Sequence, residues 1–280
     1  MRIRSWAFLL FLIPVTVGCS GISAESRNSG AFDLAKRASM KPVSIQTQEF
    51  RLAGFSKVTA QNQEITLYIE GDGLAWLDRY TVSSNPTPKN PVALKLATID
   101  QSPNKIYLAR PCQYVELKTQ VNCQQKYWTS HRFSKEVLAA YTDALDQIKK
   151  VYQSPGFHLI GFSGGGAIAA LLTSRRSDVL SLRTVAGNLD HAALNKYHKA
   201  TPLSGSLNPI SVANSTDKVP QIHYSGGSDK IVPAWIANSF SKIAGKEGCS
   251  QAYIISGVKH SDGWTESWSK LLSKKPVCKS

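Results

Sequence analysis

The sequence lacks several features that would place it in other protein classes. It has no Cys-x-x-Cys motif and no two histidines at ligand spacing on an obvious helix, which argues against a metal site. No internal repeat is visible. Lysine and arginine are scattered along the chain rather than clustered with aromatic residues, so we expect no nucleic acid partner.

The apolar run at the N-terminus is too short to span a membrane as a mature helix. Residues 6–17 are apolar and follow Arg2 and Arg4, a pattern typical of a secretory signal. The run ends at Thr16-Val17-Gly18-Cys19, which resembles a bacterial lipobox, in which the cysteine is diacylated and becomes the mature N-terminus. We therefore expect a lipoprotein-type signal peptide over residues 1–18 and a lipid on Cys19.

A plain signal peptide, cleaved for instance after Ala24, is the alternative. With Ser20 rather than Asp after the cysteine, resemblance to Gram-negative lipoproteins implies the outer membrane, on its periplasmic side. Residues 19–45 are expected to form the lipidated N-terminus and a flexible tether, because they are mostly small and polar. Residues 46–280 are enough for one domain with a sizeable core.

Acidic residues are scarce: 19 Asp and Glu stand against 33 Lys and Arg, a formal net charge of +14. Loss of Arg2 and Arg4 with the signal would leave +12. Because the cations are dispersed, we interpret this charge as attraction to anionic envelope surfaces.

Cysteine is also scarce, with five residues in the chain. A lipid on Cys19 leaves an even number, which in an exported chain suggests two disulfides. Three pairings are open, and we favour Cys112–Cys123 and Cys249–Cys278 because each closes a short or terminal segment.

Apolar runs alternate with helical patterns along the domain. Strands are expected at residues 48–58, 65–70, 105–109, 157–162, 182–186, 221–225 and 252–258, and helices at residues 134–152, 167–173, 233–243 and 263–272. This order predicts an α/β fold with a mostly parallel central sheet and helices on both faces. Residues 83–91 should be a loop. The irregular segment over residues 196–219 is typical of a lid or pocket wall.

The stretch over residues 157–166, FHLIGFSGGG, organises this pattern. It combines a buried strand, a glycine-rich turn with one serine, and a helix of small residues. Gly161-Phe162-Ser163-Gly164-Gly165 fits the G-x-S-x-G nucleophile elbow, where a strained turn leaves no room for β-carbons beside the serine.

Two further motifs follow later strands, and together with the elbow they carry a resemblance. They are Gly-Ser-Asp229-Lys-Ile-Val-Pro and Val-Lys-His260-Ser-Asp-Gly-Trp. In the order Ser163, Asp229, His260, the chain resembles the α/β-hydrolase fold over nearly the whole mature domain. The resemblance implies a Ser163–His260–Asp229 triad and no cofactor.

Other residues compete for these roles. Asp190 also follows a strand and is the rival acid. Five other histidines compete with His260. His158 and His223 lie within expected strands, which favours a structural role. His191 could line the pocket, and His131 and His198 have no placed partner.

The oxyanion hole needs two N–H donors. One would be the Gly164 N–H, and the resemblance implies a second from the loop Glu70-Gly71-Asp72-Gly73, which we assign to the Asp72 N–H with Gly71 as its neighbour. Two carboxylates there would oppose an oxyanion unless they point away or pair with Arg79 or Arg110. The alternatives are a preference for positively charged substrates, or carboxylates that hold the loop through backbone hydrogen bonds.

Several neighbouring residues have two interpretations. Gln113 or Tyr114 could line the pocket, or belong to a disulfide-braced loop. Trp76, Trp128, Trp235 and Trp264 are expected to serve packing rather than recognition.

We expect a serine hydrolase that cleaves an ester, thioester or amide of a small-molecule or acyl substrate. Esterase chemistry is the default, because no peptidase-specific feature is visible. The alternatives are an acyltransferase that uses the same triad, and a non-catalytic binding lipoprotein with this fold. The sequence does not predict an oligomeric state.

Overall fold

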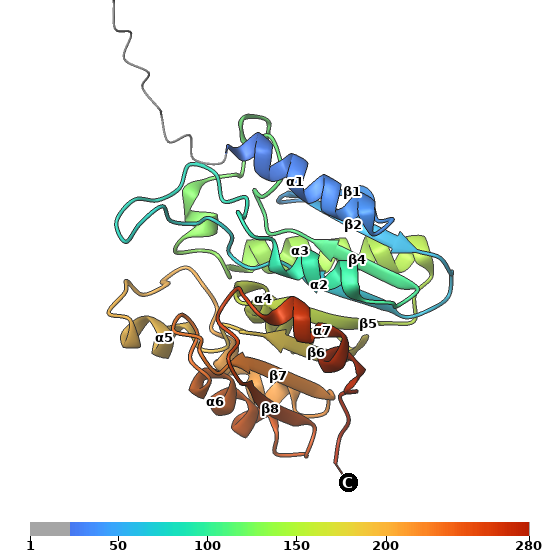
Figure 1. The fold of residues 1–280 in the computed structure, drawn as a ribbon, viewed down its shortest axis with the longest axis vertical. Coiled ribbons are helices and arrows are strands. Elements are labelled where there is room, and N and C mark those ends of the chain that lie inside the picture. Colours follow the sequence, from blue (N-terminus) through green and yellow to red (C-terminus); the bar gives the residue numbers. More distant parts are fainter. Residues whose placement is uncertain (1–22, 280) are drawn as a thin grey trace, which may run out of the picture.

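The computed structural model describes residues 23–279 of the chain (Figure 1). Cys19 and the signal peptide lie outside these residues. Eight strands form one sheet in the order β1-β2-β4-β3-β5-β6-β7-β8. Their bounds are β1 Lys41–Gln46, β2 Arg51–Val58, β3 Ile65–Ile69, β4 Asn104–Leu108, β5 Phe157–Phe162, β6 Val179–Val185, β7 Gln221–Gly226 and β8 Ser250–Ile255.

The sheet is parallel except at one end. Strands β1 and β2 pair antiparallel with each other, and β2 pairs antiparallel with β4. All the remaining pairs are parallel. The mostly parallel sheet predicted from the sequence is therefore confirmed, and the carboxyl ends of its parallel strands meet at one edge.

Helices cover both faces of the sheet, each over its own apolar core. One core contains residues of α3 (Lys135–Tyr152), α4 (Gly164–Thr173) and α6 (Trp235–Ala244). The other contains residues of α1 (Ala24–Arg37), α2 (Val92–Ile99) and α7 (Trp264–Ser273). The remaining elements are α5 (His191–Tyr197) and three 3₁₀ helices, Leu117–Thr119, Gln125–Trp128 and Pro209–Thr216.

The N-terminal part differs from the expected tether. Residues 24–37 form α1, whose first turn is capped by the Ser23 hydroxyl accepting from the Ser26 N–H at 3.1 Å. Strand β1 then pairs with β2. The helix buries only the small side chains of Ala31 and Ala35. So weak an apolar face is hard to distinguish from a polar linker in the sequence.

Helix α2 was not expected either. Its N-cap residue, Pro91, makes no side-chain capping bond. Instead the Glu70 carboxylate accepts from the N–H groups of Ala93 and Leu94, at 3.3 and 3.4 Å. A cap supplied by a distant loop leaves no local signature in the sequence. Within residues 23–279, no helix combines the length and apolar character that crossing a bilayer requires.

Candidate active site

Ser163 lies in a strained turn between β5 and α4. Its backbone has φ 50° and ψ −116°, a region that residues with a β-carbon rarely occupy. The turn is tight because a β-carbon on Gly161 would collide with the backbone of Gly165. The Ser163 N–H donates to the Val185 carbonyl of β6 at 2.9 Å. The turn thus sets the serine at the carboxyl edge of the sheet.

The structure brings Ser163 together with His260 and Asp229 in one chain of hydrogen bonds. His260 Nε2 lies 3.1 Å from Ser163 Oγ, and His260 Nδ1 lies 2.8 Å from Asp229 Oδ2. Asp229 follows β7 and His260 follows β8, so parallel neighbours deliver both side chains to the same edge. This arrangement can carry a proton from the serine hydroxyl to the imidazole.

Asp229 and His260 are each fixed by further contacts. The second carboxylate oxygen of Asp229 accepts from the N–H groups of Ile231 and Val232, at 2.8 and 2.9 Å. The His260 carbonyl accepts from Trp264 Nε1 at 2.8 Å, and the imidazole packs against the Phe162 ring. The backbone contacts thus leave the other Asp229 oxygen for the imidazole, and the Trp264 and Phe162 contacts hold the imidazole beside it.

The rival acid, Asp190, has a structural role. It caps α5 by accepting from the Ala193 N–H at 3.1 Å, and it also accepts from Asn208 Nδ2 at 2.8 Å. Within residues 23–279, Asp190 makes no hydrogen bond to His260, whose Nδ1 is bonded by Asp229 instead.

The other histidines make contacts elsewhere. His158 bonds Ser181 and Glu64, and His131 bonds Ser130. His223 bonds Thr184 and Gln221, and burial lowers its pKa to about 3. His191 is buried against Phe133, and burial lowers its pKa as well. None of these rings bonds Ser163.

Two backbone N–H groups flank the serine on the side of β3. Within residues 23–279, neither the Gly164 N–H nor the Asp72 N–H makes a hydrogen bond. The two residues are in close contact, because a β-carbon on Gly164 would collide with the Asp72 carboxylate. The Gly71 N–H differs from the expectation. It donates to Glu70 Oε1 at 2.9 Å, so it is already satisfied.

Asp72 is held between two arginines. Its carboxylate oxygens lie 2.9 Å from Arg110 Nη1 and 2.7 Å from Arg132 Nη1. Burial opposes its ionisation, but the Arg132 and Arg110 guanidinium groups outweigh burial and hold the pKa of Asp72 below its usual range. The expectation of a pairing with Arg110 is met. Arg79 instead lies over the Tyr80 ring, and sequence reasoning missed Arg132.

Glu70 has a different environment although it is only two residues away. Its buried carboxylate accepts from the Gly71, Ala93 and Leu94 N–H groups and from the Tyr107 hydroxyl. Burial raises the pKa of Glu70 from 4.5 to about 7, because these donors only partly compensate for the lost water. Glu70 thus holds the loop, as one of the sequence alternatives supposed.

A cleft of about 590 Å³ opens above Ser163 and His260. Its walls include the 70–76 loop on one side and Ile231 and Ser261 on the other. Gln113 and Tyr114 do not line it. Gln113 instead braces the loop, donating from Nε2 to the Gly71 carbonyl at 3.1 Å. The irregular segment contributes residues 198–203 to a second cleft of about 710 Å³, which shares Trp76 and Arg132 with the first.

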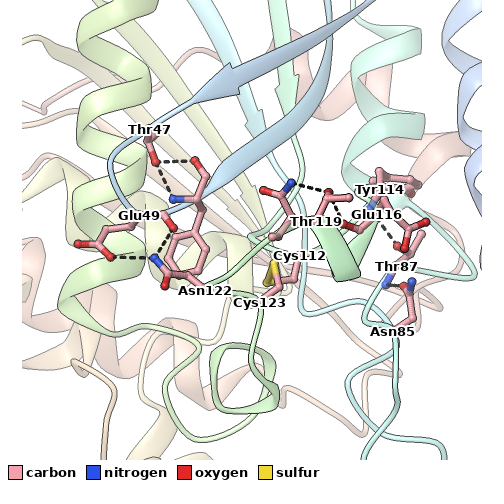
Figure 2. The surroundings of a disulfide bond; sticks show 12 residues. Thr47, Glu49, Asn85, Thr87, Cys112, Tyr114, Glu116, Thr119, Asn122 and Cys123 are labelled. Atoms are coloured by element: carbon pink, nitrogen blue, oxygen red, sulfur yellow. Dashed lines mark hydrogen bonds between the residues drawn. A yellow bond between two sulfur atoms is a disulfide. The ribbon is translucent and has the colours of Figure 1, made fainter.

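Both favoured disulfides are present, Cys112–Cys123 and Cys249–Cys278. Figure 2 shows the first of them among polar contacts that fix its loop, including Asn122 Nδ2 donating to the Glu49 carbonyl at 2.8 Å. Cys112 lies between Arg110 and Gln113 in the chain. The residues that the structure describes contain no group of three His, Cys, Asp or Glu side chains suited to a metal ion.

Comparison with known proteins gives one family and a set of similar folds. A family model described as serine hydrolase (FSH1) matches residues 88–257. No sequence among the curated proteins matches the chain.

Several solved structures are similar in fold. The Pyrococcus furiosus esterase Pf2001 has 14% identity and a TM-score of 0.62, over 85% of this chain and 91% of that one. Est1E from Butyrivibrio proteoclasticus has 13% identity and a TM-score of 0.57, over 83% and 98%. An α/β serine hydrolase homologue from Coxiella burnetii has 16% identity and a TM-score of 0.57, over 83% and 94%. At these identities the likeness shows the fold, which is that of the α/β-hydrolases.

Proposed function

This chain belongs to the serine hydrolase (FSH1) family, and we propose that it cleaves carboxylic esters through an acyl-enzyme on Ser163. Ser163 Oγ attacks the carbonyl carbon while His260 Nε2 accepts the serine proton. Asp229 keeps the proton on His260 Nδ1 and stabilises the imidazolium that forms. His260 then donates the proton to the departing alcohol. Water releases the acyl group by the same steps, with His260 as its base.

The observation that carries this proposal is the hydrogen-bonded chain from Ser163 through His260 to Asp229. A serine used only for structure would not need an imidazole whose second nitrogen is held by a buried carboxylate. The esterase assignment is supported by the fold shared with the Pyrococcus furiosus esterase.

We assign the oxyanion hole to the N–H groups of Gly164 and Asp72. A carboxylate beside a developing oxyanion would raise the energy of the transition state, but the carboxylate of Asp72 is neutralised by Arg110 and Arg132. The same neutralisation argues against the alternative of a preference for positively charged substrates.

The direct test is labelling with a fluorophosphonate probe, followed by hydrolysis of a water-soluble ester. We expect labelling of the wild type, none in Ser163→Ala, and a strong reduction in His260→Ala. Ser261→Ala is the matched control, because Ser261 lines the same cleft without bonding His260. An unlabelled wild type with intact disulfides, or labelling that persists in Ser163→Ala, would refute the proposal.

We also propose that the protein is an envelope lipoprotein anchored through Cys19. The basic residues, short apolar run and terminal cysteine of residues 1–19 support this. Mass spectrometry of the mature N-terminus would test it: a diacylated Cys19 is expected, and an unmodified terminus at residue 25 would point to ordinary cleavage after Ala24.

A further inference from the structure

Exposed large apolar side chains gather around the mouth of the catalytic cleft. Residues 23–279 contain eleven of them, and six lie there, which is the concentration expected of an interaction surface. Tyr80 is 84% exposed, Ile231 56% and Trp76 41%. We call this set the rim; its members are Trp76, Leu77, Tyr80, Tyr197, Ile231 and Trp235.

The rim is continuous from one side of the cleft to the other. Trp76 and Ile231 both line the catalytic cleft, and Trp76 and Tyr80 line the second cleft beside it. Across that opening, Tyr197 packs edge-on against Trp235, with ring centroids 5.9 Å apart. The two parts are joined where His198 Nε2 bonds the Ile231 carbonyl at 2.8 Å.

Exposed cations are interspersed with the rim. Arg79 and Lys199 line the second cleft, Lys89 lines the catalytic cleft, and Lys230 precedes Ile231 in the chain. Asp78, an exposed acid next to Arg79 in the chain, accepts from the backbone N–H groups of Tyr80 and Thr81, at 2.8 and 2.9 Å. The surface therefore presents aromatic side chains together with an excess of positive charge.

The exposed aromatic side chains and the positive charge together favour one kind of binding partner for the rim. Tryptophan and tyrosine favour the level of lipid headgroups, and nearby lysine and arginine favour anionic lipids. The core of a protein interface is instead depleted in charged residues, especially lysine. We propose that the rim docks on an anionic lipid bilayer and holds the catalytic cleft against the headgroups.

The start of the described chain agrees with this orientation. Figure 1 shows that α1 begins at the same edge of the sheet as α5 and the neighbouring loops. Ser23 follows Cys19 so closely that the intervening chain spans at most about 14 Å. A lipid on Cys19 would therefore attach near the edge that carries the rim. Only this placement of the N-terminus depends on the proposed lipidation.

The experiment is quenching of tryptophan fluorescence by brominated lipids, with the mature protein and vesicles of brominated phosphatidylglycerol or brominated phosphatidylcholine. We expect quenching by phosphatidylglycerol, weaker quenching by phosphatidylcholine, and loss of most of the quenching in Trp76→Phe/Trp235→Phe. Trp128→Phe is the matched control, because Trp128 is 5% exposed and should not reach lipid. All variants keep the same N-terminus, so a difference in quenching between variants reports the rim and not the N-terminal anchor.

Neutralising the cations tests the charge separately. Arg79→Gln and Lys199→Gln should each weaken binding to phosphatidylglycerol vesicles about 5-fold at low salt. Absence of quenching in the wild type, equal quenching by both lipids, or unchanged quenching in Trp76→Phe/Trp235→Phe would overturn the proposal. None of these readouts depends on hydrolysis, so the result is independent of the proposed catalysis.

Discussion

Two aspartates flank Ser163 from opposite sides, and their partners give them different roles. Asp229, on the loop after β7, accepts from an imidazole and two backbone N–H groups. Asp72, on the loop after β3, lies between two guanidinium groups. The imidazole can exchange a proton, whereas a guanidinium stays protonated. Asp229 can therefore assist a proton transfer, while Asp72 can only be a fixed charge.

In the proposed mechanism the two sides of the cleft therefore have different roles. The side formed by β7 and β8 holds the acid and the base, Asp229 and His260. The side formed by β3 and its arginines holds a backbone N–H in place beside the serine. Substitutions should separate the two roles. A change at Asp229 should lower the rate of hydrolysis, whereas a change at Asp72 should lower the free energy of unfolding.

The largest effect is expected at Asp229. Asp229→Asn should lower kcat/KM by about 10³–10⁴-fold, because an amide cannot hold the same imidazole tautomer or stabilise its charged form. The stability should change little, because the amide oxygen can still accept from Ile231 and Val232. Ester hydrolysis and urea unfolding measure the two quantities, and a loss below 10-fold would contradict the assignment.

At Asp72 the effect on stability should be large and the effect on activity smaller. Asp72→Asn leaves the buried Arg110 without its counterion and should lower the free energy of unfolding by about 3 kcal/mol, the low end for buried pairs because Arg132 is partly exposed. The activity should fall by no more than about 10²-fold, since the Asp72 N–H is displaced rather than removed. Asp78→Asn, an exposed acid on the same loop, is the control. A stability equal to that control would argue against the clamp.

Glu70 should make the stability depend on pH. Its pKa is raised from 4.5 to about 7, so the folded state holds a proton that the unfolded state has released. Stability should therefore fall as the pH rises from about 4.5 through 7, by roughly 3 kcal/mol from this group. Urea unfolding at pH 5 and pH 8 should show that difference in the wild type and not in Glu70→Gln. Parallel behaviour of the two proteins would contradict it.

The smallest effect is expected at Trp264. Trp264→Phe removes the hydrogen bond to the His260 carbonyl and keeps an aromatic ring in the same buried position. The histidine loop should loosen, and kcat/KM should fall about 5-fold, in line with a hydrogen bond of about 1 kcal/mol. Trp268→Phe, at another buried tryptophan of α7, serves as the control. Equal losses in both variants would indicate a general packing effect.

The sequence was most informative where local patterns decide the structure. Ser163, Asp229 and His260 each follow a strand of the parallel sheet, and parallel strands bring their carboxyl ends to one edge. Their meeting could therefore be predicted from order and motif. The mostly parallel sheet followed from the alternation of apolar runs and helical patterns for the same reason.

Long-range contacts were beyond this kind of inference. Arg132 is 60 positions from Asp72, and nothing in its neighbourhood marks it as a counterion. Helix α2 depends on a cap from Glu70, which local propensity cannot reveal. In both cases the deciding partner is distant in the sequence. Trp76 and Trp235 were expected to pack, but they are 41% and 37% exposed: Trp76 lies in the loop after β3, and Trp235 is the first residue of α6.

The Cys112–Cys123 bond links the support of the 70–73 loop to the oxidation state of two cysteines. Arg110 and Gln113, on either side of Cys112, support the loop that presents the Asp72 N–H. Without the disulfide this support is held only by noncovalent contacts, so a reductant should loosen the loop that carries the Asp72 N–H while the strands that carry Ser163, Asp229 and His260 stay in place.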